Sequence, residues 1–288
     1  MFDLTVFFDL IPLLIPCECL QSRFMQQALV GLVLLAPMAA AMGVQVVNFR
    51  MAFFADAISH SAFAGVAIGL LASVDPHLTM PAFGLLIGLG IVAVQRRSML
   101  SSDTVIGVFF SALIAFGLAV VSRDASLARD MQRFLYGDIL TIGEGEIRWL
   151  ILLFITVMAF QAWGYNRMLY IGISPTLATA HRVRVAAYQY VYAALLSLVV
   201  TFSVWAVGVL LVTALLIVPA AAARNFTRSA GAMFWWALAI SVTSAVAGLL
   251  VSAQEWARSA TGATVILFAF GWFVLSLFAT FFTKDHSL

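Results

Sequence analysis

Charged residues are scarce in this sequence, and their scarcity excludes a soluble globular fold. Asp, Glu, Lys and Arg make up 10% of the 288 residues, whereas 64% are hydrophobic and the mean hydropathy is +1.06. Water cannot solvate a surface of that composition. Because a spanning helix needs roughly 20 apolar residues, the length predicts an all-α, polytopic membrane helical bundle with about eight or nine transmembrane helices.

Lysine is nearly missing, which bears on energy supply and catalysis. Lys284 is the only lysine, so the nucleotide-binding motif G-x-x-x-x-G-K-[ST] is absent and any ATP must be hydrolysed by another polypeptide. The sequence also lacks the His-Glu-x-x-His motif of membrane metalloproteases. The basic residues form no stripe that could neutralise phosphates, which argues against nucleic-acid binding. We therefore expect a chain that is not an enzyme and has no permanently bound cofactor.

Cysteine is limited to Cys17 and Cys19. A Cys-x-Cys pair is poorly placed to close on itself within the narrow geometry of a disulfide, so we interpret the two as free thiols. A metal relay with Glu18 between them is the alternative, although two thiolates make an incomplete site. The surrounding segment is short and broken by Pro12 and Pro16, which is typical of an interfacial helix.

Long apolar runs follow and define a transmembrane domain, 24–283, between an N-terminal interfacial segment, 1–23, and a tail, 284–288. The run lengths fit helices and not barrel strands, which would alternate over about ten residues. Gly208 divides the run from Tyr188 to Ala223 and predicts two segments, or one span with a re-entrant piece. The expected spans are Phe24–Val47, Ala52–Val74, Met80–Gln95, Thr104–Val121, Trp149–Trp163, Tyr188–Ala206, Val207–Ala223, Ala230–Val251 and Thr264–Phe282.

The placement of basic residues favours one orientation in the membrane. We take the loop holding Arg167, Arg182 and Arg184 as cytoplasmic, because most of the other basic residues then lie on the same side, as the positive-inside rule expects. The segment Ser122–Arg148 carries most of the exceptions and alternates apolar with charged residues, which predicts an amphipathic helix on the outer surface. With nine passes, the other residues on the cytoplasmic side are Arg50, Arg96, Arg97, Arg224, Arg228 and Lys284.

Asp56 and His60 stand within an otherwise apolar span. A carboxylate near the bilayer centre costs roughly 2.5–3.5 kcal/mol, so something must compensate it. The i, i+4 spacing puts both side chains on one helical face, with Cβ atoms about 5–6 Å apart. Imidazole nitrogen together with carboxylate oxygen suits zinc, manganese or ferrous iron. Two copies of the pair in a symmetric dimer would supply the four ligands that zinc usually takes.

Two simpler interpretations of this pair stay open at this point. The two side chains could pair only with each other, or Asp56 could be hydrated near the interface. Ala64 and Ala67 share the face of the pair and are small enough to leave room beside it, while Gly65 and Gly69 mark another face suited to close helix contact.

Four tracts occur in an order that carries a resemblance to a known family. The stretch Asp-Ala-Ile-Ser-His-Ser-Ala-Phe-Ala-Gly-Val-Ala-Ile-Gly, residues 56–69, resembles the second-helix signature of the zinc and manganese ABC uptake permeases, including its Asp and His. Ser102–Gly107, Leu135–Leu140 and Val207–Arg224 resemble later tracts of the same family. The last of these resembles the pore-lining tract, which implies a pore or gating role for Thr213 and Pro219.

The segment Ile173–Val183 lies between spans and has the signals of a short helix, with Ser174 as N-cap and Pro175 at the first helical position. It resembles the coupling helix of the family, which docks on the ATPase, although a short loop helix without a partner is the alternative. The family more usually has Gly where Arg182 stands. The resemblance implies that Ser174, Pro175, Leu177, Ala178, His181 and Arg182 couple the chain to the ATPase.

The resemblance implies the membrane-spanning permease subunit of an ATP-driven zinc or manganese importer in the bacterial inner membrane. The implied partners are a cytoplasmic ABC ATPase dimer, an extracytoplasmic metal-binding protein and a second copy of the chain. An ion-coupled secondary metal transporter is the alternative, with Asp56 and His60 as a proton relay. An intramembrane hydrolase would need Ser59 or Ser61 as nucleophile, and both point to helix faces other than that of His60.

Overall fold

The computed structural model describes residues 18–122, 139–257 and 259–284, and within these ranges all regular structure is helical. This confirms the predicted all-α class. The elements are η1 (Glu18–Gln21), α2 (Arg23–Asn48), α3 (Phe54–Leu71), α4 (Pro76–Arg97), α5 (Ser102–Val121), η2 (Ile139–Thr141), α7 (Glu144–Ile173), α8 (Pro175–Ala180), α9 (Val185–Val207), α10 (Val209–Phe226), α11 (Ala230–Ser252) and α12 (Thr261–Lys284).

Eight of the described helices are long and apolar enough to cross a membrane, namely α2, α4, α5, α7, α9, α10, α11 and α12. The helix α3, which has 18 residues, lies between the first two of these in the chain. The observed number therefore agrees with the predicted eight or nine. Gly208, with φ 83° and ψ 165°, separates α9 from α10, so the long run from Tyr188 to Ala223 forms two helices, as predicted.

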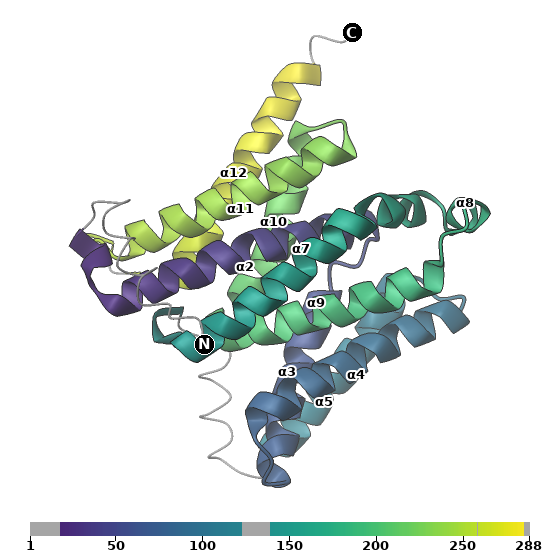
Figure 1. The fold of residues 1–288 in the computed structure, drawn as a ribbon, viewed down its shortest axis with the longest axis horizontal. Coiled ribbons are helices and arrows are strands. Elements are labelled where there is room, and N and C mark those ends of the chain that lie inside the picture. Colours follow the sequence, from purple (N-terminus) through teal and green to yellow (C-terminus); the bar gives the residue numbers. More distant parts are fainter. Residues whose placement is uncertain (1–17, 123–138, 258, 285–288) are drawn as a thin grey trace.

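Helix α2 lies inside the bundle, with α11 and α12 on one side of it and α3, α4 and α5 on the other (Figure 1). It packs against α7, α9, α10 and α11. The contact with α10 is close because Gly43 has no side chain: a Cβ there would lie 1.8 Å from the carbonyl oxygen of Leu216. Helix α3 packs on α4 in the same manner, since a Cβ at Gly65 would lie 2.9 Å from Met80 Cα. The predicted glycine face of α3 is therefore a helix contact.

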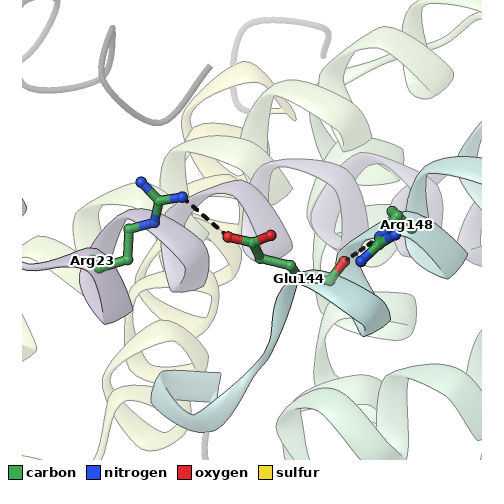
Figure 2. A network of polar contacts seen from close by, with 3 residues as sticks. All are labelled: Arg23, Glu144 and Arg148. Carbon is green, nitrogen blue, oxygen red and sulfur yellow. Dashed lines mark hydrogen bonds and ion pairs between the residues drawn. The ribbon is translucent and has the colours of Figure 1, made fainter. Parts of the chain in front are cut away.

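The two ends of the bundle differ in their polar residues. At one end Arg23 of α2 forms an ion pair of 3.0 Å with Glu144 of α7, and Arg148 Nε donates to the Glu144 carbonyl oxygen at 3.3 Å (Figure 2). An exposed pair of this kind stabilises by less than about 1 kcal/mol, but it fixes the starts of α2 and α7 side by side. Helix α8 lies at the opposite end (Figure 1).

A cavity of about 1030 Å³ opens at the α8 end. Arg50, Arg96 and Arg224 line it, together with Pro175 and Thr176 of α8. Three arginines that the sequence analysis assigned to one side of the membrane are thus gathered around a single space. The other described end carries Asp75 and Glu144 near helix starts, whereas Asp56 and Asp103 lie in the first turns of helices that start beside the cavity.

Two local expectations were wrong. Arg167 was expected in a loop, but α7 runs for 30 residues to Ile173 and includes it. Arg148 was expected in the preceding segment and instead lies near the start of the same helix. Charged residues at a helix end do not interrupt its backbone hydrogen bonds, because long arginine side chains extend to the polar boundary. The rest of the proposed outer amphipathic helix, 123–138, and most of the N-terminal segment with Cys17 lie outside the described residues.

Candidate metal-binding site

Asp56 lies in the first turn of α3, six residues after Arg50 and close to the start of the helix. The hydropathy pattern predicts it inside a span that begins at Ala52, and the difference has a local cause. Arg50 adopts a left-handed conformation, φ 55°, and the chain turns there before α3 begins at Phe54. A carboxylate in a first turn interacts favourably with the free N–H groups and the positive end of the helix dipole. This position lowers the cost of holding Asp56 within the membrane.

Asp56 and His60 lie on the one strip of the first turns of α3 that a single chain leaves open. Both side chains are half-buried, whereas the residues between them, Ala57, Ile58 and Ser59, are fully buried. The i, i+4 spacing puts the carboxylate and the imidazole on the same face. The structure therefore keeps the predicted pair together and accessible.

The ring of His60 is held by a hydrogen bond to its own helix. Nδ1 lies 2.9 Å from the carbonyl oxygen of Asp56. A carbonyl oxygen can only accept, so Nδ1 carries the proton and Nε2 of the neutral ring keeps its lone pair. Metal-binding histidines commonly have such a partner on the second nitrogen, which fixes the ring and its tautomer. In this arrangement Nε2 is the nitrogen available to a cation.

Two aromatic rings support the imidazole from the sides. Phe110 of α5 lies edge-on at 4.9 Å between ring centroids, and Phe63 of α3 at 5.8 Å. No ion pair joins His60 to the carboxylate of Asp56 among the described residues, although the two groups interact electrostatically. Sequence reasoning missed Phe110, because only the packing of α3 on α5 brings it to the histidine.

One chain supplies an incomplete ligand set. Among the described residues, no group of three or more His, Cys, Asp or Glu side chains could hold a metal ion. One carboxylate and one imidazole are two ligands, whereas zinc takes four. Ala64 and Ala67, which were expected to leave room beside the pair, are buried in the bundle. Further ligands for an ion on this strip would therefore come from beyond the described residues of one chain.

The serines beside His60 do not form a nucleophilic site. Ser59 and Ser61 are fully buried, and Ser61 Oγ donates to the Ile58 carbonyl oxygen at 2.7 Å. Neither lies on the open strip with the imidazole. The arrangement therefore gives the hydrolase alternative no support.

Helix α8 has the local structure that the sequence predicts. The Leu177 N–H donates to Ser174 Oγ at 3.4 Å, which caps the helix, and Pro175 is its first residue. Ala178 is fully buried and attaches the helix to the bundle, whereas Leu177 is 43% exposed. One side of this short helix is thus an anchor, and the other side is available to a partner.

The hydrogen bonds at the end of α8 explain the left-handed backbone of Arg182. Val183 N–H donates to the Ala178 carbonyl oxygen and Arg182 N–H to that of Thr179, the pattern in which a left-handed residue closes a helix. Arg182 is that residue, with φ 58°. Gly suits this conformation because it has no Cβ, which is the physical reason for Gly at the matching family position. His181 stacks on Tyr170 at 5.6 Å between ring centroids.

The two residues assigned to the pore lie on different sides of α10. Thr213 is half-buried, and its hydroxyl donates to the Leu210 carbonyl oxygen of its own helix at 3.3 Å. Pro219 is buried within the bundle. Helix α10 contacts α3, so Thr213 belongs to a helix next to the one that carries Asp56.

Fold and site together define a polytopic membrane protein with a half-open pair of metal-type ligands. Residues 21–280 match the ABC 3 transport family, and the chain belongs to that family. It is a multi-pass protein of the bacterial inner membrane and a permease of this transport class.

Relatives with established names agree with this placement. The chain is 31% identical to the high-affinity zinc uptake system membrane protein ZnuB of Haemophilus influenzae, over 87% of this chain and 95% of that protein. It is also 31% identical to the manganese transport system membrane protein MntC of Listeria monocytogenes, over 90% of this chain and 92% of the relative.

Solved structures share the fold. PsaBC from Streptococcus pneumoniae in complex with Fab matches with a TM-score of 0.76 and 26% identity, covering 95% of both chains. A putative metal-chelate type ABC transporter in an inward-facing conformation matches with a TM-score of 0.71 at 14% identity, over 88% of this chain and 85% of that one. The second likeness concerns the fold alone.

Proposed function

We propose that this chain is the permease subunit of an ATP-driven importer of zinc or manganese, in which Asp56 and His60 hold the ion in transit. The observation that carries the proposal is the free Nε2 of His60, fixed by the 2.9 Å bond from Nδ1, on the half-open strip beside Asp56. Relatives named for zinc uptake and for manganese transport support it. A site made of a few side chains, two from each chain, can bind an ion and still release it, as a transport pathway requires.

A second copy of the chain would complete the ligand set. The half-open strip of α3 lies beside α5, whose outer face carries small residues at every fourth position: Gly107, Ser111, Ala115 and Ala119. A Cβ at Gly107 would meet no atom of the described residues within 4 Å. Small residues at this spacing let helices approach closely in membranes. Joining two copies along α5 would bring two Asp56 and two His60 side chains to one axis.

The α8 end is the cytoplasmic side in this account. Arg50, Arg96 and Arg224 surround the cavity at that end, in agreement with the positive-inside rule. A cytoplasmic ATPase dimer would dock on the exposed side of α8, around Leu177, and its closure on ATP would tilt the helices to alternate access. A metal-binding protein would deliver the ion at the opposite end, so the chain itself needs no ATPase site.

Two observations bear on the choice of metal. Two imidazoles and two carboxylates suit either zinc or manganese. The tract Gly107–Ser111, in which some zinc-type permeases carry a histidine, has none. The ligand chemistry therefore admits both ions, and the lack of that histidine favours manganese.

Uptake of radioactive zinc and manganese tests the proposal. Cells that lack other uptake systems for these ions would express the chain with its ATPase and binding protein. We expect Asp56→Asn and His60→Ala each to lower uptake at least about tenfold, as the loss of a metal ligand or its support does. Asp75→Asn and His77→Gln are controls of the same residue types, because Asp75 caps α4 at the far end of the bundle and the His77 ring contacts Trp205.

The outcomes separate the competing functions. Wild-type uptake in both α3 variants would remove the proposed site. Uptake that persists with an ATPase whose nucleotide-binding lysine is replaced would instead identify an ion-coupled secondary transporter.

A further inference from the structure

A groove of about 610 Å³ runs between α7 and α9, next to the loop that follows α8. None of its lining residues belongs to α3, the helix of Asp56 and His60; α7 and α9 run past each other in the bundle (Figure 1). Its apolar walls include Phe160, Trp163 and Val191. Trp163 is 87% exposed and Val191 46% exposed. In a membrane, such exposed apolar side chains contact acyl chains.

The rim of the groove at the α8 end is basic. Arg167 of α7 and the loop residues Arg182 and Arg184 line it, and all three are exposed. Among the described residues no carboxylate lines the groove, and the sequence contains no Asp or Glu from Trp149 to Gln254. The described residues around the rim therefore do not neutralise its positive charge.

Two features hold the basic rim in place. Arg167 Nη1 donates to the Tyr188 hydroxyl, and its guanidinium carbon lies 5.5 Å from the centre of the tyrosine ring. These contacts occupy one face and one donor of a group that has five N–H donors. Arg182 keeps a left-handed backbone that Gly would adopt without strain.

We propose that this groove binds an anionic phospholipid, with the phosphate at Arg167, Arg182 and Arg184 and an acyl chain along Phe160, Trp163 and Val191. The combination of an open apolar channel with a cationic end matches an amphiphile whose headgroup carries a negative charge. Aromatic side chains and arginines at this level are typical of the membrane interface. A soluble phosphate would make use of the rim but not of the apolar walls.

The lipid would join α7, α9 and the loop that ends α8. The Arg182 and Arg184 backbone belongs to the segment that closes α8 through the Val183 to Ala178 hydrogen bond. A headgroup bridging this loop to Arg167 would steady α8 against the bundle. This inference rests on the proposed function in one respect, that the α8 end is the cytoplasmic, ATPase-docking side.

Lipid binding is measurable on the purified full chain without transport. The detergent-solubilised protein is titrated with dioleoylphosphatidylglycerol, and the lipid adducts are followed by native mass spectrometry. We expect Arg167→Gln combined with Arg184→Gln to weaken binding on the order of 30-fold, as the loss of two basic residues near a headgroup implies. Arg97→Gln combined with Arg228→Gln removes the same charge from residues that do not line the groove, and we expect near wild-type affinity.

Each further result decides for or against the lipid. Weak binding of zwitterionic dioleoylphosphatidylcholine by all variants supports the role of headgroup charge. Equal weakening by both double variants would overturn the proposal, because it would indicate a general charge effect. Displacement of the lipid by equimolar glycerol 3-phosphate would also overturn it in favour of a soluble phosphate. Unchanged lipid affinity with lost co-purification of the ATPase would assign the rim to that partner. A failure of Asp56 or His60 variants to affect uptake leaves these measurements unaffected.

Discussion

His60 donates its Nδ1 proton to the carbonyl oxygen of Asp56, one helical turn earlier, at 2.9 Å. The bond leaves Nε2 as the only ring nitrogen with a lone pair. The same turn of α3 presents the Asp56 carboxylate on the half-open strip. One local hydrogen bond thus orients the imidazole beside the carboxylate, as the proposed transport site requires.

A cross-linking experiment tests the proposed dimer along α5. In a chain with Cys17 and Cys19 replaced by Ser, we expect Ser111→Cys to form a disulfide-linked dimer in membranes on mild oxidation. A symmetric contact at this small residue brings the two Cα atoms within the range of about 4.4–6.8 Å that a disulfide needs. The measurement is a dimer band on a non-reducing gel.

Thr156→Cys is the matched control for this cross-link. Thr156 and Ser111 are both exposed, and each hydroxyl donates to the carbonyl oxygen four residues earlier in its helix. Equal cross-linking at both positions, or none at Ser111→Cys, would contradict a dimer built on α5.

Close packing between α2 and α10 gives a stability prediction. A Cβ on Gly43 would lie 1.8 Å from the Leu216 carbonyl oxygen, so Gly43→Ala forces the two helices apart. We expect the free energy of unfolding to fall by about 1–3 kcal/mol. The melting temperature of the detergent-solubilised protein, followed by tryptophan fluorescence, measures the change.

Gly271→Ala in α12 is the control for the glycine prediction. A Cβ at Gly271 would meet no atom within 4 Å. Alanine there is expected to stabilise the helix by about 0.5–1 kcal/mol. A melting temperature for Gly43→Ala at or above the wild-type value would show that α2 and α10 do not approach as described.

Arg182→Gly is expected to raise stability. Arg182 holds φ 58° at the end of α8, and a left-handed conformation costs a non-glycine residue about 1 kcal/mol. The substitution relieves that cost, and the melting temperature should increase. Arg184 has φ −76°, so Arg184→Gly relieves no backbone strain, and this variant should have a lower melting temperature than the wild type. The opposite order of the two variants would contradict the assigned end of α8.

Leu177→Asp tests the docking role of α8. Leu177 is 43% exposed, so the variant chain should fold. Losing an apolar contact residue at an interface costs about 2 kcal/mol of binding free energy, so ATPase association should weaken about 30-fold. Co-purification of the ATPase measures this. Ala178 is fully buried, and Ala178→Asp is expected to reduce the amount of folded protein instead. Normal ATPase association in the folded Leu177 variant would exclude this side of α8 as the docking surface.

Features with local signals could be predicted from the sequence. The apolar runs, the break at Gly208 and the Ser174 cap with Pro175 depend on a few neighbouring residues, and the structure has them. The i, i+4 spacing of Asp56 and His60 likewise fixed a common face. These features follow from the helical period and from capping chemistry, without knowledge of the packing.

Features that depend on packing or on backbone torsions could not be predicted. The start of α3 after the left-handed Arg50, and the extension of α7 past Arg167, depend on where backbone hydrogen bonds stop and not on hydropathy. The contact of Phe110 with His60 requires α5 to lie against α3. The groove likewise forms only when α7 brings Arg167 beside Arg184. Each of these joins residues that the sequence separates.

The stoichiometry of metal binding tests the central claim most directly. Equilibrium dialysis of the purified permease against zinc and against manganese should give one bound ion per two chains, and His60→Ala should abolish that binding. One ion bound per single chain, or the same binding with and without the His60 imidazole, would contradict a transport site shared by two copies of Asp56 and His60.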